Sequence, residues 1–175
     1  MGMGIRTCGR GRDCRGKELN PLRWVLDTNV VIDWLMFNDP YMNPLRERVI
    51  DGRVLVLTHQ PAQDEFKRVL AYKQLKLTPE RQQEIFARYC QYTSVVSLPS
   101  GASLQNLMMP AGFPRCRDRD DEHFIALAFH QKADALISRD NAVFGLKSRA
   151  EKFGLTILNV QQAIGLLGSE EIAES

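Results

Sequence analysis

The chain has 175 residues and a formal net charge of +2 at pH 7, a length that suits one domain with a sizeable core. Hydrophobic residues make up 44% and charged residues 25% of the sequence, which excludes the polar composition of a disordered chain. No apolar run approaches the roughly 20 residues that cross a bilayer, and the N-terminus lacks the apolar stretch of a signal peptide. We therefore expect a cytoplasmic protein.

The charge is unevenly distributed. Residues 1–20 carry five basic and two acidic residues, so the remaining chain has a net charge of −1. We expect a disordered, basic Gly/Arg-rich leader over 1–20, a single domain over 21–168 and an acidic tail over 169–175. Because the domain is not basic as a whole, a polyanion would have to be held by a few local arginines.

Apolar runs alternate with segments of helical periodicity, which is typical of an α/β protein with a parallel sheet. The runs are rich in leucine and β-branched residues, as expected for strands covered on both faces. We predict strands at 24–27, 54–58, 94–98, 135–138 and 155–160, and helices at 30–37, 43–51, 61–75, 78–92, 120–133 and 160–168. Residues 99–117 form a long connection rich in Pro, Gly and Ser, of a kind that is usually functional or disordered.

The short stretch VLDTN, residues 25–29, ends an apolar run on an aspartate. Asp27 would stand at the carboxyl end of the first strand, and Asp140 just past the strand at 135–138. Glu65 and Asp121 fall in the first turns of two helices that follow or precede such strands. Ligands of parallel α/β sheets bind at this edge, so the four carboxylates are expected to converge there.

Converging carboxylates repel one another unless a positive charge lies between them. Oxygen ligands without an accompanying histidine or thiolate suit Mg²⁺ or Mn²⁺, and such ions activate water in phosphodiester cleavage. Each acid also has a purely structural interpretation. Asp27 could cap a helix, Glu65 could be solvated with Asp64 as the functional neighbour, Asp140 could make a turn, and the acids 118 to 122 could simply begin a helix.

The segments VLDTNVVID (25–33), DEFKRVL (64–70), CRDRDDEHFIALA (116–128) and ADALISRD (133–140) together resemble the PIN domain family of metal-dependent ribonucleases. The likeness is greatest to toxins of bacterial toxin–antitoxin pairs and spans about residues 23–160. It implies a PIN-like three-layer α/β fold, with a central, mostly parallel sheet of four to five strands flanked by helices.

The resemblance also implies the residues of the site. It assigns metal binding and catalysis to Asp27, Glu65, Asp121 and Asp140, with Asn29 and Ser138 as polar supporters. Asp121 is preferred to its neighbour at 120 because it precedes FIALA by the family's three-residue step. Three arginines flank the acids in sequence and are candidates for RNA contacts, or for surface charge that balances the aspartates: Arg117, Arg119 and Arg139.

Some positions depart from the family pattern. Ala142 stands where some relatives carry a further acid, and His59 stands at a helix entry where a small or apolar residue is commoner. The histidines His123 and His130 are seven residues apart on one predicted helix. We interpret them as structural or exposed, not as ligands.

The resemblance therefore implies an endoribonuclease dependent on Mg²⁺ or Mn²⁺ that leaves 5′-phosphate and 3′-hydroxyl ends. It further implies a cognate antitoxin as partner, and a homodimer. One alternative is a degenerate PIN fold that binds protein or RNA without cleaving it. The other is a magnesium-dependent phosphatase of the haloacid dehalogenase type, which requires a second acid two residues after Asp27, where this chain has Asn29.

Overall fold

A central five-stranded sheet organises the computed structural model, which describes residues 20–97 and 109–173. All four pairings between neighbouring strands are parallel, in the order β3-β2-β1-β4-β5. The strands are β1 (Leu22–Leu26), β2 (Val54–Thr58), β3 (Thr93–Val95), β4 (Ala135–Ile137) and β5 (Ile157–Leu158). The predicted α/β fold with a parallel sheet is confirmed, although β3 and β5 are shorter than expected. The predicted leader lies outside the described residues, except for residue 20.

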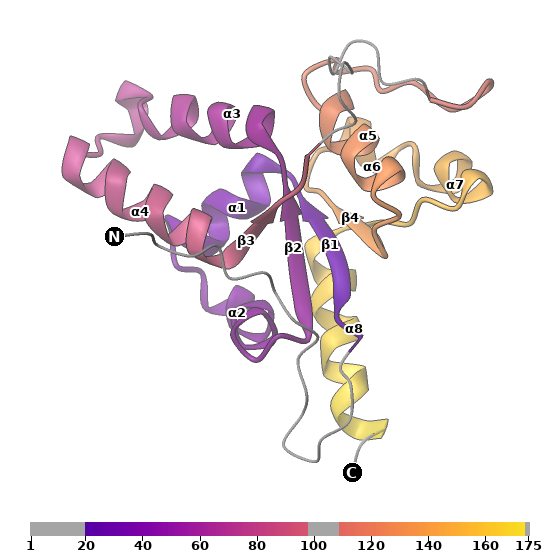
Figure 1. Cartoon of the computed structure of the whole chain (residues 1–175), viewed down its shortest axis with the longest axis horizontal. Coiled ribbons are helices and arrows are strands. Elements are labelled where there is room, and N and C mark those ends of the chain that lie inside the picture. The colour runs from indigo at the N-terminus through magenta and orange to yellow at the C-terminus, as the bar shows by residue number, and fades with distance from the viewer. Residues whose placement is uncertain (1–19, 98–108, 174–175) are drawn as a thin grey trace.

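Side chains alternate between the two faces of the sheet, so each strand feeds two cores. On β1, Trp24 and Leu26 belong to one buried cluster and Val25 to the other; on β4, Leu136 faces away from its two neighbours. Figure 1 shows the resulting three layers. One cluster is covered mainly by α1 (Thr28–Leu35), α2 (Asn43–Ile50), α3 (Gln60–Leu70), α4 (Pro79–Tyr92) and α8 (Val160–Ala173), and the other mainly by α5 (Glu122–His130), α6 (Asn141–Phe144) and α7 (Lys147–Ala150).

Capping residues set several helix boundaries. Thr78 accepts a hydrogen bond from the backbone N–H of Arg81 at 3.3 Å, and Pro79 is the first residue of α4, as predicted. Gly154, with a φ of 82°, ends the 3₁₀ turn η4 (Glu151–Phe153) in the left-handed conformation. Two more 3₁₀ turns are η1 (Pro40–Met42) and η2 (Lys73–Leu75).

Three helix predictions need correction. The helix expected over 61–75 ends at Leu70, because the backbone turns through η2 and reverses at Lys76, which has a φ of 50°. The last helix continues past 168 to Ala173, so residues 169–173, expected as a tail, are helical. The short helices α6 and α7 were not predicted, since four-residue helices are too short to show periodicity.

The described end of the long connection packs on the sheet's second layer. The ring of Phe113 lies 5.4 Å from that of Phe129 in α5 and 5.1 Å from that of Phe153. Cys116 is buried in the same layer. These contacts fix the segment that leads into Asp121. Residues 98–108 lie outside the described residues. None of the described helices is long and apolar enough to cross a membrane.

Substitution of Leu136 tests how much burial on the central strands contributes to stability. Its side chain is fully buried in β4, so Leu136→Ala should lower the free energy of unfolding by about 2–5 kcal/mol. Leu166 of α8 is 49% exposed, and Leu166→Ala should change it by less than about 0.5 kcal/mol. Urea unfolding followed by circular dichroism measures both. Equal losses in the two variants would contradict the burial described here.

Candidate active site at the carboxyl edge of the sheet

Asp27 is a buried carboxylate at the end of β1, with only 2% of the residue exposed. Its Oδ1 accepts a hydrogen bond from the backbone N–H of Val30 at 2.8 Å and so caps α1. Its Oδ2 accepts from the Ser138 hydroxyl and from the backbone N–H of Arg139 at 3.1 Å. The capping role weighed from the sequence is therefore real, and it coexists with the position at the edge of the sheet.

Burial raises the pKa of Asp27 above its ordinary value. The hydrogen bonds from Ser138, Val30 and Arg139 act in the opposite direction, and the charge of Asp140 adds to the rise. The carboxyl group is thus held in place by three donors while its charged form is disfavoured by its surroundings. A positive charge close to this edge would relieve that penalty.

Ser138 links two of the candidate acids. The side chain is buried at 1% exposure and donates to Asp27, while its oxygen accepts from the backbone N–H of Asp140 at 3.0 Å. Asp140 in turn caps α6 through a 2.5 Å bond from the backbone N–H of Ala142 to Oδ1. The end of β4 is therefore fixed against the end of β1 through Ser138.

Glu65 in α3 is held by residues from two other helices. Its Oε1 accepts from the Thr28 hydroxyl at 2.5 Å, and its Oε2 lies 2.7 Å from Nε2 of His123. Burial raises the pKa of Glu65, but the bonds from His123 and Thr28 outweigh it, and the net effect lowers the pKa. Asp64, the alternative considered from the sequence, is exposed and bonds to Gln60 within the same helix.

Sequence reasoning missed the roles of Thr28 and His123. Thr28 lies inside the conspicuous VLDTN stretch, and His123 is two residues after Asp121, so nearness in sequence to the acids was the available signal. The prediction singled out Asn29 instead. Asn29 is exposed on α1 and, within the described part of the chain, makes no hydrogen bond to the candidate acids.

The carboxylate of Asp121 interacts electrostatically with the other three candidate acids. It lies at the N-terminus of α5, where its side chain accepts no capping bond. Partial burial, followed by the charges of other carboxylates, raises the pKa of Asp121 to about 6. Those carboxylates are Asp140, Asp118, Asp27 and Glu65. Because such repulsion requires proximity, the four acids lie near one another at one edge of the sheet.

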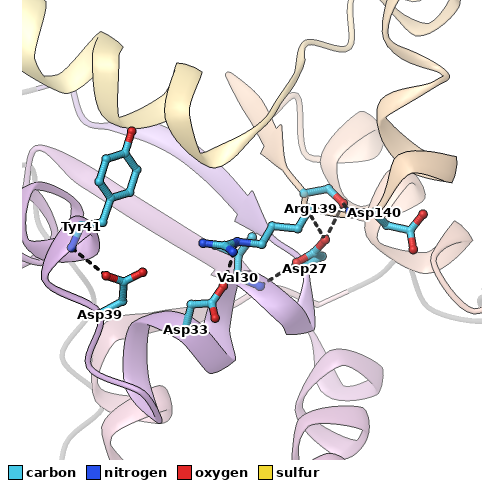
Figure 2. A network of polar contacts seen from close by, with 8 residues as sticks. Asp27, Val30, Asp33, Asp39, Tyr41, Arg139 and Asp140 are labelled. Carbon is cyan, nitrogen blue, oxygen red and sulfur yellow. Dashed lines mark hydrogen bonds and ion pairs between the residues drawn. The ribbon is translucent and has the colours of Figure 1, made fainter.

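The arginines do not neutralise this cluster equally. Arg139 forms an ion pair with Asp33 of α1, with Nε and Oδ2 2.8 Å apart. Figure 2 shows the Arg139 side chain and the Asp140 carboxylate extending in opposite directions from adjacent residues. This contact favours the charge-balancing interpretation of Arg139. Arg117 and Arg119 are exposed on the segment before α5.

His59 caps no backbone group, although it stands at the N-cap position of α3. The residue is 1% exposed, its ring centroid lies 5.2 Å from that of His123, and neither ring nitrogen bonds to a described residue. Burial and the neighbouring His123 lower its pKa to about 4, so the ring is neutral at pH 7. His59 therefore adds no positive charge to the acid cluster.

The donor set suits a hard divalent cation. As the side chains stand, no three described acid, histidine or cysteine residues are arranged to ligate one ion together. Mg²⁺, however, keeps several water ligands and needs only one or two direct carboxylates. The mutual repulsion at Asp121 and its lack of a capping bond are what an oxygen-ligated cation would relieve, so the residues fit such an ion.

Comparison with known proteins identifies the class of this protein. A family model described as PIN domain matches residues 23–142. Since the match covers more than half of the chain, the chain belongs to the PIN domain family, as the sequence resemblance indicated. The match lends no support to the haloacid dehalogenase alternative. No curated protein matches the sequence.

A solved structure has the same fold. It is the crystal structure of VapBC2 from Rickettsia felis bound to a DNA fragment from their promoter, which superposes with a TM-score of 0.54 at 11% identity. The alignment covers 79% of this chain and 98% of that chain. At this identity the likeness shows the shared fold.

The repulsion at Asp121 predicts an unusual stability profile. The pKa of about 6 in the folded protein exceeds the ordinary value of 3.8, so the charged form destabilises the metal-free fold above about pH 6. Asp121→Asn should therefore melt at a higher temperature than the wild type at pH 7.5 in EDTA. The difference should shrink as the pH falls through 6 and vanish near 4.

Thermal melts of Asp120→Asn serve as the control, because this substitution removes the same charge from an exposed neighbour. It should raise the melting temperature less than Asp121→Asn does. A wild type that is as stable as Asp121→Asn at pH 7.5, or a difference that does not change with pH, would contradict the described crowding of carboxylates.

Proposed function

We propose that this protein is a metal-dependent endoribonuclease that hydrolyses RNA phosphodiester bonds, and that it is the toxin of a toxin–antitoxin pair. Membership of the PIN domain family supports nuclease activity. The observation that carries the proposal is the placement of Asp27 and Asp140 at the carboxyl ends of β1 and β4, where Ser138 bonds to both residues. Asp121 and Glu65, from other parts of the chain, lie close enough for their charges to act on the same cluster.

In this proposal Asp27, Glu65, Asp121 and Asp140 hold one or two Mg²⁺ or Mn²⁺ ions. Such an ion lowers the pKa of water to generate the attacking group and stabilises the charge that develops on the leaving oxygen. The other residues act by positioning. Ser138 and the backbone at Arg139 orient Asp27, and Thr28 and His123 orient Glu65.

Substrate contacts are proposed for the arginines nearest the acids. Arg117 and Arg119 are exposed and precede Asp121 by a few residues, so their guanidinium groups can donate to phosphate oxygens. Arg139 is a weaker candidate while it is paired with Asp33. Cleavage that leaves a 5′-phosphate and a 3′-hydroxyl follows the PIN family resemblance.

The toxin role is supported by the similar fold of VapBC2, whose structure is described as bound to a DNA fragment from its promoter. By analogy we propose that this chain pairs with a small antitoxin and that the nuclease forms a homodimer. A degenerate PIN fold that only binds RNA or protein is the competing possibility. Titration with Mn²⁺ separates the two, since a degenerate site should take up none at millimolar concentration.

Cleavage of single-stranded RNA tests the nuclease proposal. Asp27→Asn and Glu65→Gln should each reduce the rate in Mg²⁺ or Mn²⁺ by at least about 100-fold, because each removes a charged ligand. Asp64→Asn alters the exposed acid beside Glu65 and should leave the rate unchanged. Folded Asp27→Asn and Glu65→Gln proteins that retain the full rate would disprove the proposed site.

Growth on expression tests the toxin proposal separately. Induction of the wild type in a bacterial host should arrest growth, whereas induction of Asp27→Asn to the same level should not, because the arrest requires cleavage. Co-expression of the product of a small neighbouring gene should restore growth. An Asp27→Asn protein as toxic as the wild type would rule out a nuclease toxin.

A further inference from the structure

Two histidine rings with unpartnered nitrogens lie together beside the acid cluster. His59 directly precedes α3 and is 1% exposed, His123 belongs to α5, and their ring centroids are 5.2 Å apart. Within the described part of the chain, both ring nitrogens of His59 and Nδ1 of His123 are buried and have no hydrogen-bond partner. Buried polar atoms are normally paired with protein, water or an ion. Three such nitrogens in two adjoining rings point to a ligand that takes up their lone pairs.

The bond between His123 and Glu65 determines which nitrogen of His123 is available. Nε2 of His123 lies 2.7 Å from Oε2 of Glu65, and the charged carboxylate can only accept a hydrogen bond. Nε2 therefore carries the hydrogen, which leaves the lone pair of the neutral ring on Nδ1, the unpartnered atom. A histidine that donates one ring N–H to a carboxylate and presents its other nitrogen is the usual form of a metal-bound histidine.

His59 is also in the form that binds a metal. Burial, followed by the charge of His123, lowers its pKa to about 4, so the ring is neutral at pH 7 and keeps a lone pair. The backbone of His59 itself acts on this pKa, but no described group reaches hydrogen-bond geometry with either ring nitrogen. A neutral imidazole binds a metal ion without first losing a proton.

Two imidazole nitrogens favour a transition-metal ion over magnesium. Imidazole suits zinc, copper and nickel, whereas Mg²⁺ prefers oxygen ligands. No third described acid, histidine or cysteine is placed to ligate the same ion, so water would supply the other ligands. His123 lines a groove of about 960 Å³, which gives the ion and its water ligands a path to the two rings.

We propose that His59 and His123 form a second metal site, separate from the carboxylate cluster, that binds Zn²⁺. His59 supplies one ring nitrogen and His123 supplies Nδ1, while Glu65 orients the ring of His123. The site adjoins the acid cluster through Glu65, but its nitrogen ligands select a different ion. A water molecule that bridges the two rings is the competing occupant, and it predicts no metal binding. The proposal does not depend on the nuclease function.

Nuclear magnetic resonance of the histidine rings tests the site directly, because the chain has only three histidines. The full-length protein, with ¹⁵N in its histidine rings, is titrated with one equivalent of Zn²⁺ in millimolar Mg²⁺, which competes for the carboxylates. It carries Cys8→Ser and Cys14→Ser so that thiolates of the leader do not take up Zn²⁺. The ring nitrogens of His59 and His123 should shift, and those of His130 should not.

Calorimetric titration with Zn²⁺ then measures what each residue contributes. His59→Gln and His123→Gln should each weaken binding at least about tenfold, because each removes a ligand, and Glu65→Gln should weaken it about tenfold by removing the carboxylate that orients His123. His130→Gln makes the same exchange elsewhere on α5 and should leave the affinity unchanged. The ring spectra need no histidine substitution, so they decide the matter even if His59→Gln does not fold.

Asp140→Asn separates the two metal sites, since it removes a proposed ligand of the hard cation and should leave Zn²⁺ binding unchanged. The proposal is overturned if Zn²⁺ shifts neither His59 nor His123, or if folded His59→Gln and His123→Gln proteins bind Zn²⁺ as tightly as the wild type. These measurements contain no RNA. An inactive nuclease would therefore leave them readable, and a failed Zn²⁺ titration would leave the nuclease proposal intact.

Discussion

The buried carboxylate of Asp27 is the contact on which the site depends. Moving a charged group from water into a protein is costly unless hydrogen bonds compensate. Here the donors come from the first turn of α1 and from the end of β4, 111 and 112 residues further along the chain. One side chain thus joins two neighbouring strands and a helix, and Ser138 links it to Asp140.

Glu65 and Asp121 have fewer hydrogen-bond partners than Asp27, and their pKa values shift in opposite directions. Glu65 has two side-chain donors that lower its pKa, whereas Asp121 has no capping bond and a pKa raised to about 6. A cluster selected only for stability would replace such an acid with a neutral residue. The arrangement is explained if stability of the metal-free protein is sacrificed for the binding of a cation, which is the usual compromise at functional sites.

Two grooves are lined by residues that support or flank the candidate acids. Glu65 and His123 line a groove of about 960 Å³, while Ser138 and Arg139 line a second groove of about 680 Å³. In the second groove the guanidinium of Arg139 is paired with Asp33, so its charge is already balanced within the protein.

The sequence predicted the sheet and the position of the acids because both follow from local patterns. Runs such as VLVLT read directly as buried strands, and the rule that parallel strands end at a common edge places Asp27 and Asp140 together. Thr28 and His123 could not be assigned in the same way. Their bonds to Glu65 span 37 and 58 residues and depend on how α1, α3 and α5 pack, which periodicity does not specify. The pairing of Arg139 with Asp33 escaped prediction for the same reason.

The most direct test of the central claim is a crystal structure of the wild type grown with Mn²⁺, with the metal located by its anomalous scattering. The four-carboxylate account predicts a peak at the carboxyl edge of the sheet, within ligand distance of oxygens from at least two of Asp27, Glu65, Asp121 and Asp140. A crystal that contains millimolar Mn²⁺ and shows no peak at this edge would contradict it.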